Sequence, residues 1–141
     1  MYKVGDVLRV SQPYSSTGTE KKCRWFVFLG RCHFTEIPRN IFLCTTTTQL
    51  EKYKDNKAAV CVEFKAGNSC FDRDCLLCLD ELETSFTEDA FISRFQPEMK
   101  GNVGPDKLRE IVRKLRQADV SPRIVQDITE SFRLDGIPTS I

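Results

Sequence analysis

Short apolar runs separated by polar segments fill the first part of the chain. Runs rich in Val, Ile, Phe and Leu, bounded by turn-forming residues, are typical of β-strands. The pattern predicts strands over residues 4–10, 24–30, 40–49, 58–64 and 74–79. Residues 25–29 are continuously apolar, which favours a strand buried on both faces. Gly5 and Asp6 mark a turn where the first strand starts.

The last part of the chain changes to helical periodicity. Residues 83–86 are interpreted as a short strand, followed by a helical turn that ends near residue 95. Two amphipathic helices are predicted after it, the first starting at Gly104-Pro105 and the second at Ser121-Pro122, since Pro favours the first helical position. Their apolar stripes are Leu108, Ile111, Val112 and Leu115 in the first helix, and Ile124, Val125, Ile128 and Phe132 in the second.

This order of elements predicts the fold class. Several short strands followed by helices are typical of an α+β or mainly β protein, with a small, strongly bent antiparallel sheet or partly open barrel and C-terminal helices packed on it. The length favours one domain. Residues 1–118 would form the barrel with the first terminal helix, and residues 119–141 would add a further helix and tail to the same domain.

Net charge and cysteine content limit the kinds of binding site that the chain can have. A net charge of +1 means that any nucleic-acid-binding patch has to be local. No signal peptide or membrane span is evident, so a cytoplasmic protein is expected, in which cysteines act as small buried hydrophobes. Cys70, Cys75, Cys78 and His33 are a candidate zinc set. However, Cys75 and Cys78 are three apart in a strand and face opposite ways, so no metal or cofactor is predicted. His33, in a loop, is interpreted as a surface residue.

Four consecutive threonines, residues 45–48, end the third predicted strand. Pleating sends alternate hydroxyls to opposite faces, and a hydroxyl both donates and accepts hydrogen bonds without net charge. The run is explained either by the strand preference of Thr or by contacts to phosphate and sugar oxygens. Arg24 stands at the start of an apolar strand. Burying an unpaired charge is unfavourable, so its guanidinium group has to stay in solvent or bind an anion.

The order of these parts resembles the MazF/PemK (Kid) family of toxin endoribonucleases. The matching motifs are Gly5-Asp6 before an apolar strand, Arg24 at the start of the second strand, Thr47-Thr48-Gln49 at the end of the third, and the Gly101-Asn-Val-Gly-Pro-Asp-Lys-Leu segment before the helix. The likeness covers residues 4–117. The family usually has Pro after the Arg, where this chain has Trp25, and the Thr run leaves open whether Thr46 or Thr47 takes the catalytic position.

The resemblance implies an SH3-like, CcdB/PemK-like barrel and metal-independent cleavage of single-stranded RNA. The ribose 2′-OH would attack phosphorus and leave a 2′,3′-cyclic phosphate and a 5′-OH. Arg24 would stabilise transition-state charge, Thr47 would donate a hydrogen bond to the same centre, and Glu20 is a candidate base or Arg-orienting group. RNA-binding positions would be Lys21, Lys22, Thr46, Thr48 and Gln49.

The resemblance also implies a homodimer whose RNA groove is silenced by a cognate antitoxin, with no membrane partner. Two alternatives stay open. One is a non-catalytic, CcdB-like gyrase inhibitor, and the other is a nucleic-acid- or protein-binding barrel module. The sequence specifies neither the cleavage motif nor the role of residues 121–134.

Overall fold

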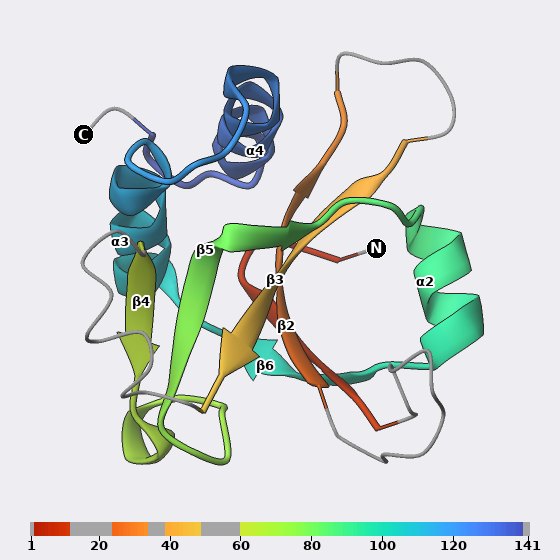
Figure 1. Ribbon diagram of the computed structural model, residues 1–141, viewed down its shortest axis with the longest axis vertical. Coiled ribbons are helices and arrows are strands. Elements are labelled where there is room, and N and C mark those ends of the chain that lie inside the picture. The colour runs from red at the N-terminus through yellow and green to blue at the C-terminus, as the bar shows by residue number, and fades with distance from the viewer. Residues whose placement is uncertain (1, 12–23, 34–38, 49–59, 140–141) are drawn as a thin grey trace.

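The computed structural model of this chain describes residues 2–11, 24–33, 39–48 and 60–139, drawn as coloured ribbon in Figure 1. The strands are β1 (Asp6–Val10), β2 (Arg24–Arg31), β3 (Ile41–Thr47), β4 (Cys61–Phe64), β5 (Cys75–Glu83) and β6 (Glu98–Asn102). The helices are the 3₁₀ turn η1 (Ala66–Asn68), α2 (Glu88–Phe95), α3 (Pro105–Leu115) and α4 (Pro122–Leu134).

All six described strands form one antiparallel sheet, in the order β4-β5-β3-β2-β1-β6. The sheet curls into a half-barrel (Figure 1). The pairing register shifts in three of its ladders, between Val7 and Leu8, between Phe28 and Gly30, and between Cys44 and Thr46. Irregularities of this kind bend the strand that carries them and increase its twist, which accounts for the curl. The predicted α+β class with a bent antiparallel sheet is confirmed.

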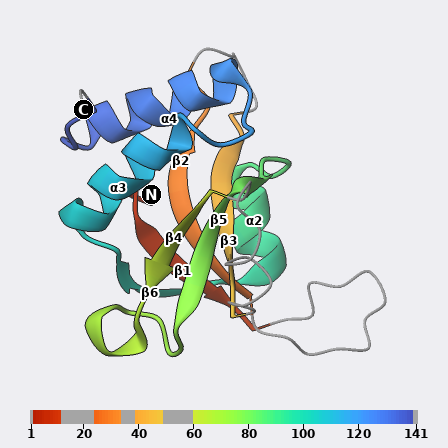
Figure 2. The same cartoon turned by 60° about the vertical axis from the view of Figure 1, so that its left-hand side comes forward.

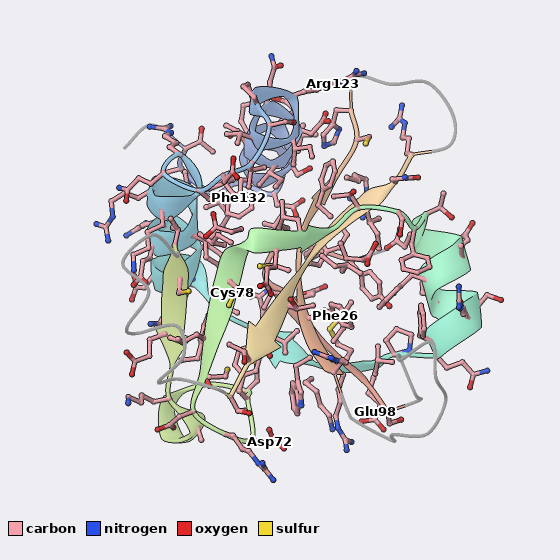
Figure 3. All side chains as sticks on the ribbon, viewed as in Figure 1. Phe26, Asp72, Cys78, Glu98, Arg123 and Phe132 are labelled. Carbon is pink, nitrogen blue, oxygen red and sulfur yellow. The ribbon has the colours of Figure 1, made fainter. Side chains whose placement is uncertain are left out.

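The sheet separates two hydrophobic clusters, which define its two faces. Val27 and Leu29 of β2 point to the face covered by α3 and α4, here called the α3/α4 face. Phe26 and Phe28 point to the opposite face, the α2 face, where Phe26 meets Phe91 of α2. Figure 2 shows α2 on the opposite side of the sheet from α3 and α4, and Figure 3 places Phe26 and Phe132 on these two sides. As predicted, β2 is buried on both faces.

Both C-terminal helices start where the sequence predicts. Gly104, with φ 88°, precedes Pro105 at the first position of α3. Ser121 caps α4, because its Oγ accepts a hydrogen bond from the Ile124 N–H at 3.4 Å. The two predicted apolar stripes point into the α3/α4-face cluster, where Leu108, Ile111 and Phe132 are almost completely buried. Among the described residues, no helix combines the length and apolarity that crossing a membrane requires.

One prediction for the middle of the chain is wrong, and another underestimates a helix. Residues 83–86 do not form a separate strand, because β5 continues from Cys75 to Glu83 and the chain then turns into α2. The predicted helical turn is a full helix, capped by the Thr87 Oγ, which accepts from the Ala90 N–H at 3.3 Å. Strand β6 was not predicted. Its sequence, Glu-Met-Lys-Gly-Asn, is exposed almost throughout and lacks the alternation that marks a strand.

The edge strand β4 is covered by lysines of α3. The Lys107 Nζ donates to the Glu63 carbonyl at 2.6 Å, and the Lys114 Nζ donates to the Cys61 carbonyl at 2.8 Å. These carbonyls lack a neighbouring strand on that side in the described sheet. Charged donors thus satisfy backbone acceptors that a free edge would otherwise present to another chain.

Helix α4 docks on β2 through a close contact at Gly30. A Cβ at this glycine would lie 2.6 Å from the Ser131 Cβ, and the φ of 144° is one that side chains rarely tolerate. The Ser131 Oγ accepts from the Arg31 N–H at 3.1 Å and lies 2.7 Å from the His33 Nε2. The buried Asp127 carboxylate accepts from the His33 N–H at 2.9 Å. His33 is therefore a half-buried docking residue rather than the surface residue that was predicted.

Candidate functional site

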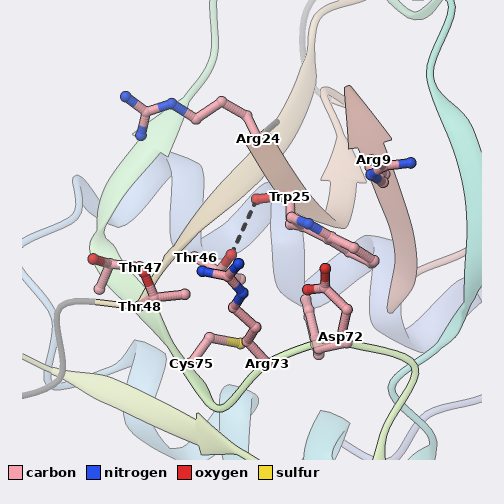
Figure 4. Close-up of a pocket in the computed structure, with 10 residues that line it drawn as sticks. Arg9, Arg24, Trp25, Thr46, Thr47, Thr48, Asp72, Arg73 and Cys75 are labelled. Atoms are coloured by element: carbon pink, nitrogen blue, oxygen red, sulfur yellow. Dashed lines mark hydrogen bonds between the residues drawn. The ribbon is translucent and has the colours of Figure 1, made fainter. Parts of the chain in front are cut away.

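A pocket of about 580 Å³ opens where β2 starts and β3 ends. Residues from β1, β2, the end of β3, the start of β5 and the segment before it line the pocket, and Figure 4 shows them. They are Arg9, Arg24, Trp25, Thr46, Thr47, Thr48, Phe71, Asp72, Arg73 and Cys75. The pocket combines guanidinium groups, hydroxyls and an aromatic ring, which is a composition suited to a phosphate-bearing ligand.

The strand register assigns Arg24 and Thr47 to the same face of the sheet. In the β2–β3 ladder Phe26 lies opposite Thr45, so the same antiparallel register continued by two residues sets Arg24 opposite Thr47. Directly opposed residues point to the same face, with Cβ atoms about 4.5–5.5 Å apart. This is the α2 face, to which Phe26 points. Of the two threonines left open by the sequence, Thr47 is the one that shares a face with Arg24.

Thr46 belongs to the other side of the strand. It lies opposite Trp25 by the same register, and its Oγ1 donates to the Trp25 carbonyl at 3.4 Å. Arg9 of β1 is also opposite Trp25, so Arg9, Trp25 and Thr46 form a row on the α3/α4 face. In the close-up, Arg24 and Thr47 extend toward one side of the pocket, whereas Trp25, Asp72 and Arg9 occupy the other (Figure 4).

Three pocket residues that carry charge were not predicted from the sequence: Arg9, Asp72 and Arg73. Arg9 interrupts an otherwise apolar strand, and this break in the pattern was the available signal. Asp72 and Arg73 precede β5, and only the placement of β5 beside β3 brings them to the Thr run. No local sequence pattern indicates that contact, because it depends on pairing between distant segments.

The charge in the pocket is predominantly positive. Arg9 is paired with Glu98, at 3.5 Å from its guanidinium. Arg24 and Arg73 are exposed, and within the described part of the chain no ion pair engages either of them. Two guanidinium groups beside the Thr run are therefore available to an anionic ligand, together with one carboxylate, Asp72.

The remaining predicted site residues fall outside the described residues. These are Glu20, Lys21, Lys22 and Gln49, and their roles stay predictions. Thr48 lines the pocket and is exposed. Of the eight positions expected from the sequence, the structure thus brings together Arg24, Thr46, Thr47 and Thr48.

The cysteines near the pocket are neutral at ordinary pH. Burial raises the pKa of Cys75, which lines the pocket, to about 12. Burial likewise raises the pKa of Cys78, which lies opposite Cys61 in the β4–β5 ladder, to about 12. A thiol acts as a nucleophile only as its thiolate, so Cys75 is not suited to that role. Among the described residues, no group of three or more His, Cys, Asp or Glu side chains is arranged to hold a metal ion.

These thiols predict how stability changes with pH. Their ordinary pKa is 9.0, so between pH 9.0 and about 12 both thiols are protonated in the folded chain and ionised in the unfolded chain. Unfolding then releases protons, and the free energy of unfolding falls as pH rises through this window. Urea denaturation at a series of pH values should show a shallower decline for Cys75→Ala/Cys78→Ala than for the wild type. Equal slopes in both proteins would contradict the prediction.

Fold and pocket together define an α+β protein whose curled half-barrel sheet carries a cationic, threonine-rich pocket at one end of its central strands. A scan against models of known protein families finds no match for this chain, and a search among curated proteins finds none either. The likeness to the MazF/PemK toxins therefore stands on the sequence motifs and their order.

Proposed function

We propose that this protein is an endoribonuclease that cleaves single-stranded RNA at the Arg24/Thr47 pocket. The observation that carries the proposal is the register of β2 and β3, which, continued by two residues beyond its last pair, Phe26 and Thr45, sets a guanidinium and a hydroxyl opposite each other on one face of the sheet. Both line a pocket that also contains Arg9 and Arg73. The pocket is large enough for a nucleotide, since small-ligand sites commonly measure about 300–1,000 Å³.

The proposed reaction is an internal transesterification. The ribose 2′-oxygen forms a bond to the adjacent phosphorus while the bond from phosphorus to the 5′-oxygen of the next nucleotide breaks. The 2′-OH proton passes to a base, and the departing 5′-oxygen takes up a proton. Products are a 2′,3′-cyclic phosphate and a 5′-OH end. DNA lacks the 2′-OH, so it would not be cleaved.

Each residue of the pair has a distinct role in this proposal. The Arg24 fork pairs with two non-bridging phosphate oxygens, whose negative charge increases at the transition state. The Thr47 hydroxyl donates a hydrogen bond to the same group. A Thr hydroxyl is too weakly acidic to serve as the base. Glu20 keeps that role as a sequence-based expectation.

The test is incubation of purified protein with a long single-stranded RNA in excess EDTA. We expect cleavage at discrete sites, with cyclic phosphate termini identified by mass spectrometry, and no cleavage of DNA with the corresponding sequence. A folded protein that leaves several different RNAs intact would overturn the proposal. RNA retention without cleavage would then favour a binding module, and inhibition of gyrase would favour the CcdB-like alternative.

The same resemblance supports two companion expectations, a homodimer and a cognate antitoxin that occupies the RNA groove. The cytoplasmic location expected from the sequence alone is part of the same proposal. Sedimentation of the purified chain tests the homodimer directly, because a monomer at micromolar concentration would contradict it.

A further inference from the structure

We propose that the α3/α4-face half of the pocket is a guanine subsite. Trp25 stacks on the base, Asp72 accepts hydrogen bonds from its Watson–Crick edge, and Arg73 holds an adjoining phosphate. The inference rests on the proposed function, because it assumes that the ligand is single-stranded RNA. It adds a base preference to that function.

Trp25 is positioned as a stacking platform. Its indole is half-buried and packs against Phe71, with ring centroids 5.6 Å apart and the planes tilted by 48°. Phe71 in turn packs on Phe64, at 4.9 Å, so the indole is supported from the core. The rest of the ring lines the pocket. Stacking on an aromatic ring is how proteins commonly hold an unpaired base, and each stacked base contributes about 1–3 kcal/mol.

Asp72 is an unexpected charge in this pocket. A carboxylate next to arginines weakens a site that binds only an anion, unless the carboxylate pairs with one of them. Within the described residues, Asp72 makes no ion pair or hydrogen bond with Arg9, Arg24 or Arg73. Instead, its carboxylate is directed toward the Trp25 indole (Figure 4). Two acceptor oxygens beside a ring on which a base can stack suit a base edge that presents hydrogen-bond donors.

Guanine is the base whose edge matches a carboxylate. Its Watson–Crick edge presents two adjacent donors, N1–H and the N2 amino group, and a carboxylate accepts both through its two oxygens. Adenine and cytosine each present one amino group next to a ring nitrogen acceptor, which repels the second oxygen. Uracil presents N3–H between two carbonyls. Single-stranded RNA leaves this edge open to the protein.

The chain contains one tryptophan, so its fluorescence reports on this subsite alone. The experiment titrates the protein with the 5′-monophosphates of guanosine, adenosine, cytidine and uridine and follows quenching of Trp25. We expect guanosine monophosphate to bind about tenfold or more tightly than the other three, because a bidentate pair discriminates between bases by about that factor. Equal affinity for all four nucleotides would overturn the inference.

Asp72→Asn supplies the decisive variant. An amide offers one acceptor and one donor, so it no longer matches the two guanine donors, and the preference for guanine should be lost. Adenosine and cytidine monophosphates, whose bases present one donor beside one acceptor, should bind at least as tightly as they bind the wild type. Asp89→Asn, an exposed carboxylate in the first turn of α2, is the matched control and should keep the preference. Guanine preference retained in Asp72→Asn would also overturn the inference.

Two further measurements separate this inference from the ribonuclease proposal and separate RNA from free nucleotide. Guanine preference without any RNA cleavage would support the subsite and contradict the ribonuclease. RNA cleavage at sites with no guanine preference would support the ribonuclease and contradict the guanine subsite. Competition between guanosine triphosphate and a non-cleavable oligonucleotide with one guanine shows whether the guanine that binds belongs to RNA or to a free nucleotide. The oligonucleotide should bind more tightly. The opposite order of affinities would overturn the assignment to RNA.

Discussion

Replacing Arg24 with alanine is expected to lower the maximal rate of single-stranded RNA cleavage by about a hundredfold or more. The β2–β3 register, continued two residues beyond the Phe26–Thr45 pair, sets this side chain opposite Thr47, and in the described part of the chain no ion pair holds it away from a ligand. Its loss removes a cation from the site where phosphate charge increases. The measurement is single-turnover cleavage with protein in excess over a short labelled RNA.

Arg123→Ala is the matched control for this experiment. Arg123 is exposed near the start of α4, at the opposite end of the molecule from Asp72 (Figure 3), and its removal should leave the rate unchanged.

Thr47→Ala, like Arg24→Ala, should lower the maximal rate. Thr46→Ala should instead raise the protein concentration needed for half-maximal rate, because Thr46 faces the base side of the pocket. The assignment of faces fails if Thr46→Ala and Thr47→Ala reverse these effects.

Gly30→Ala is expected to destabilise the fold by about 3 kcal/mol, the sum of overpacking and backbone strain. The added Cβ would overlap Ser131 of α4, and the backbone at Gly30 has a φ of 144°. Helix α4 would have to move away from β2, which would expose Ile128 and Phe132. Urea denaturation followed by circular dichroism measures the change in the free energy of unfolding.

Gly67→Ala supplies the comparison, because a Cβ there meets nothing within 4 Å and the φ is not positive. Its effect should stay within about 0.5 kcal/mol, as for most exposed substitutions. Adding Ser131→Gly to Gly30→Ala removes the atoms that clash and should recover part of the lost stability. Similar unfolding curves for Gly30→Ala and Gly67→Ala would show that α4 does not need the close approach.

The elements that the sequence predicted correctly are those with buried apolar side chains, in a continuous run or at a regular spacing. Strands β1 to β5 and helices α3 and α4 have the apolar patterns that burial requires, so the local sequence was enough to predict them. Strand β6 was missed because an exposed edge strand needs no apolar pattern. Helix α2 was underestimated because its apolar residues, including Phe91 and Phe95, follow a stretch of mixed periodicity.

The pocket was predicted only in part, and the division has a physical reason. Arg24 and the Thr run could be found because they interrupt or end strong strand signals. Asp72 and Arg73 could not, because β5 approaches β3 through pairing across about 30 residues of chain, and local patterns do not encode such contacts. The choice between Thr46 and Thr47 needed the β2–β3 register, which a run of identical residues conceals.

The lysines of α3 make the two edges of the sheet unlike each other. At the β4 edge, Lys107 and Lys114 occupy the backbone acceptors that a strand from another molecule would need. The outer edge of β6 pairs with no described strand. Among the described strands, the two edges of the sheet therefore differ: the outward carbonyls of Cys61 and Glu63 already have charged donors, which disfavours pairing of β4 with a strand from another molecule.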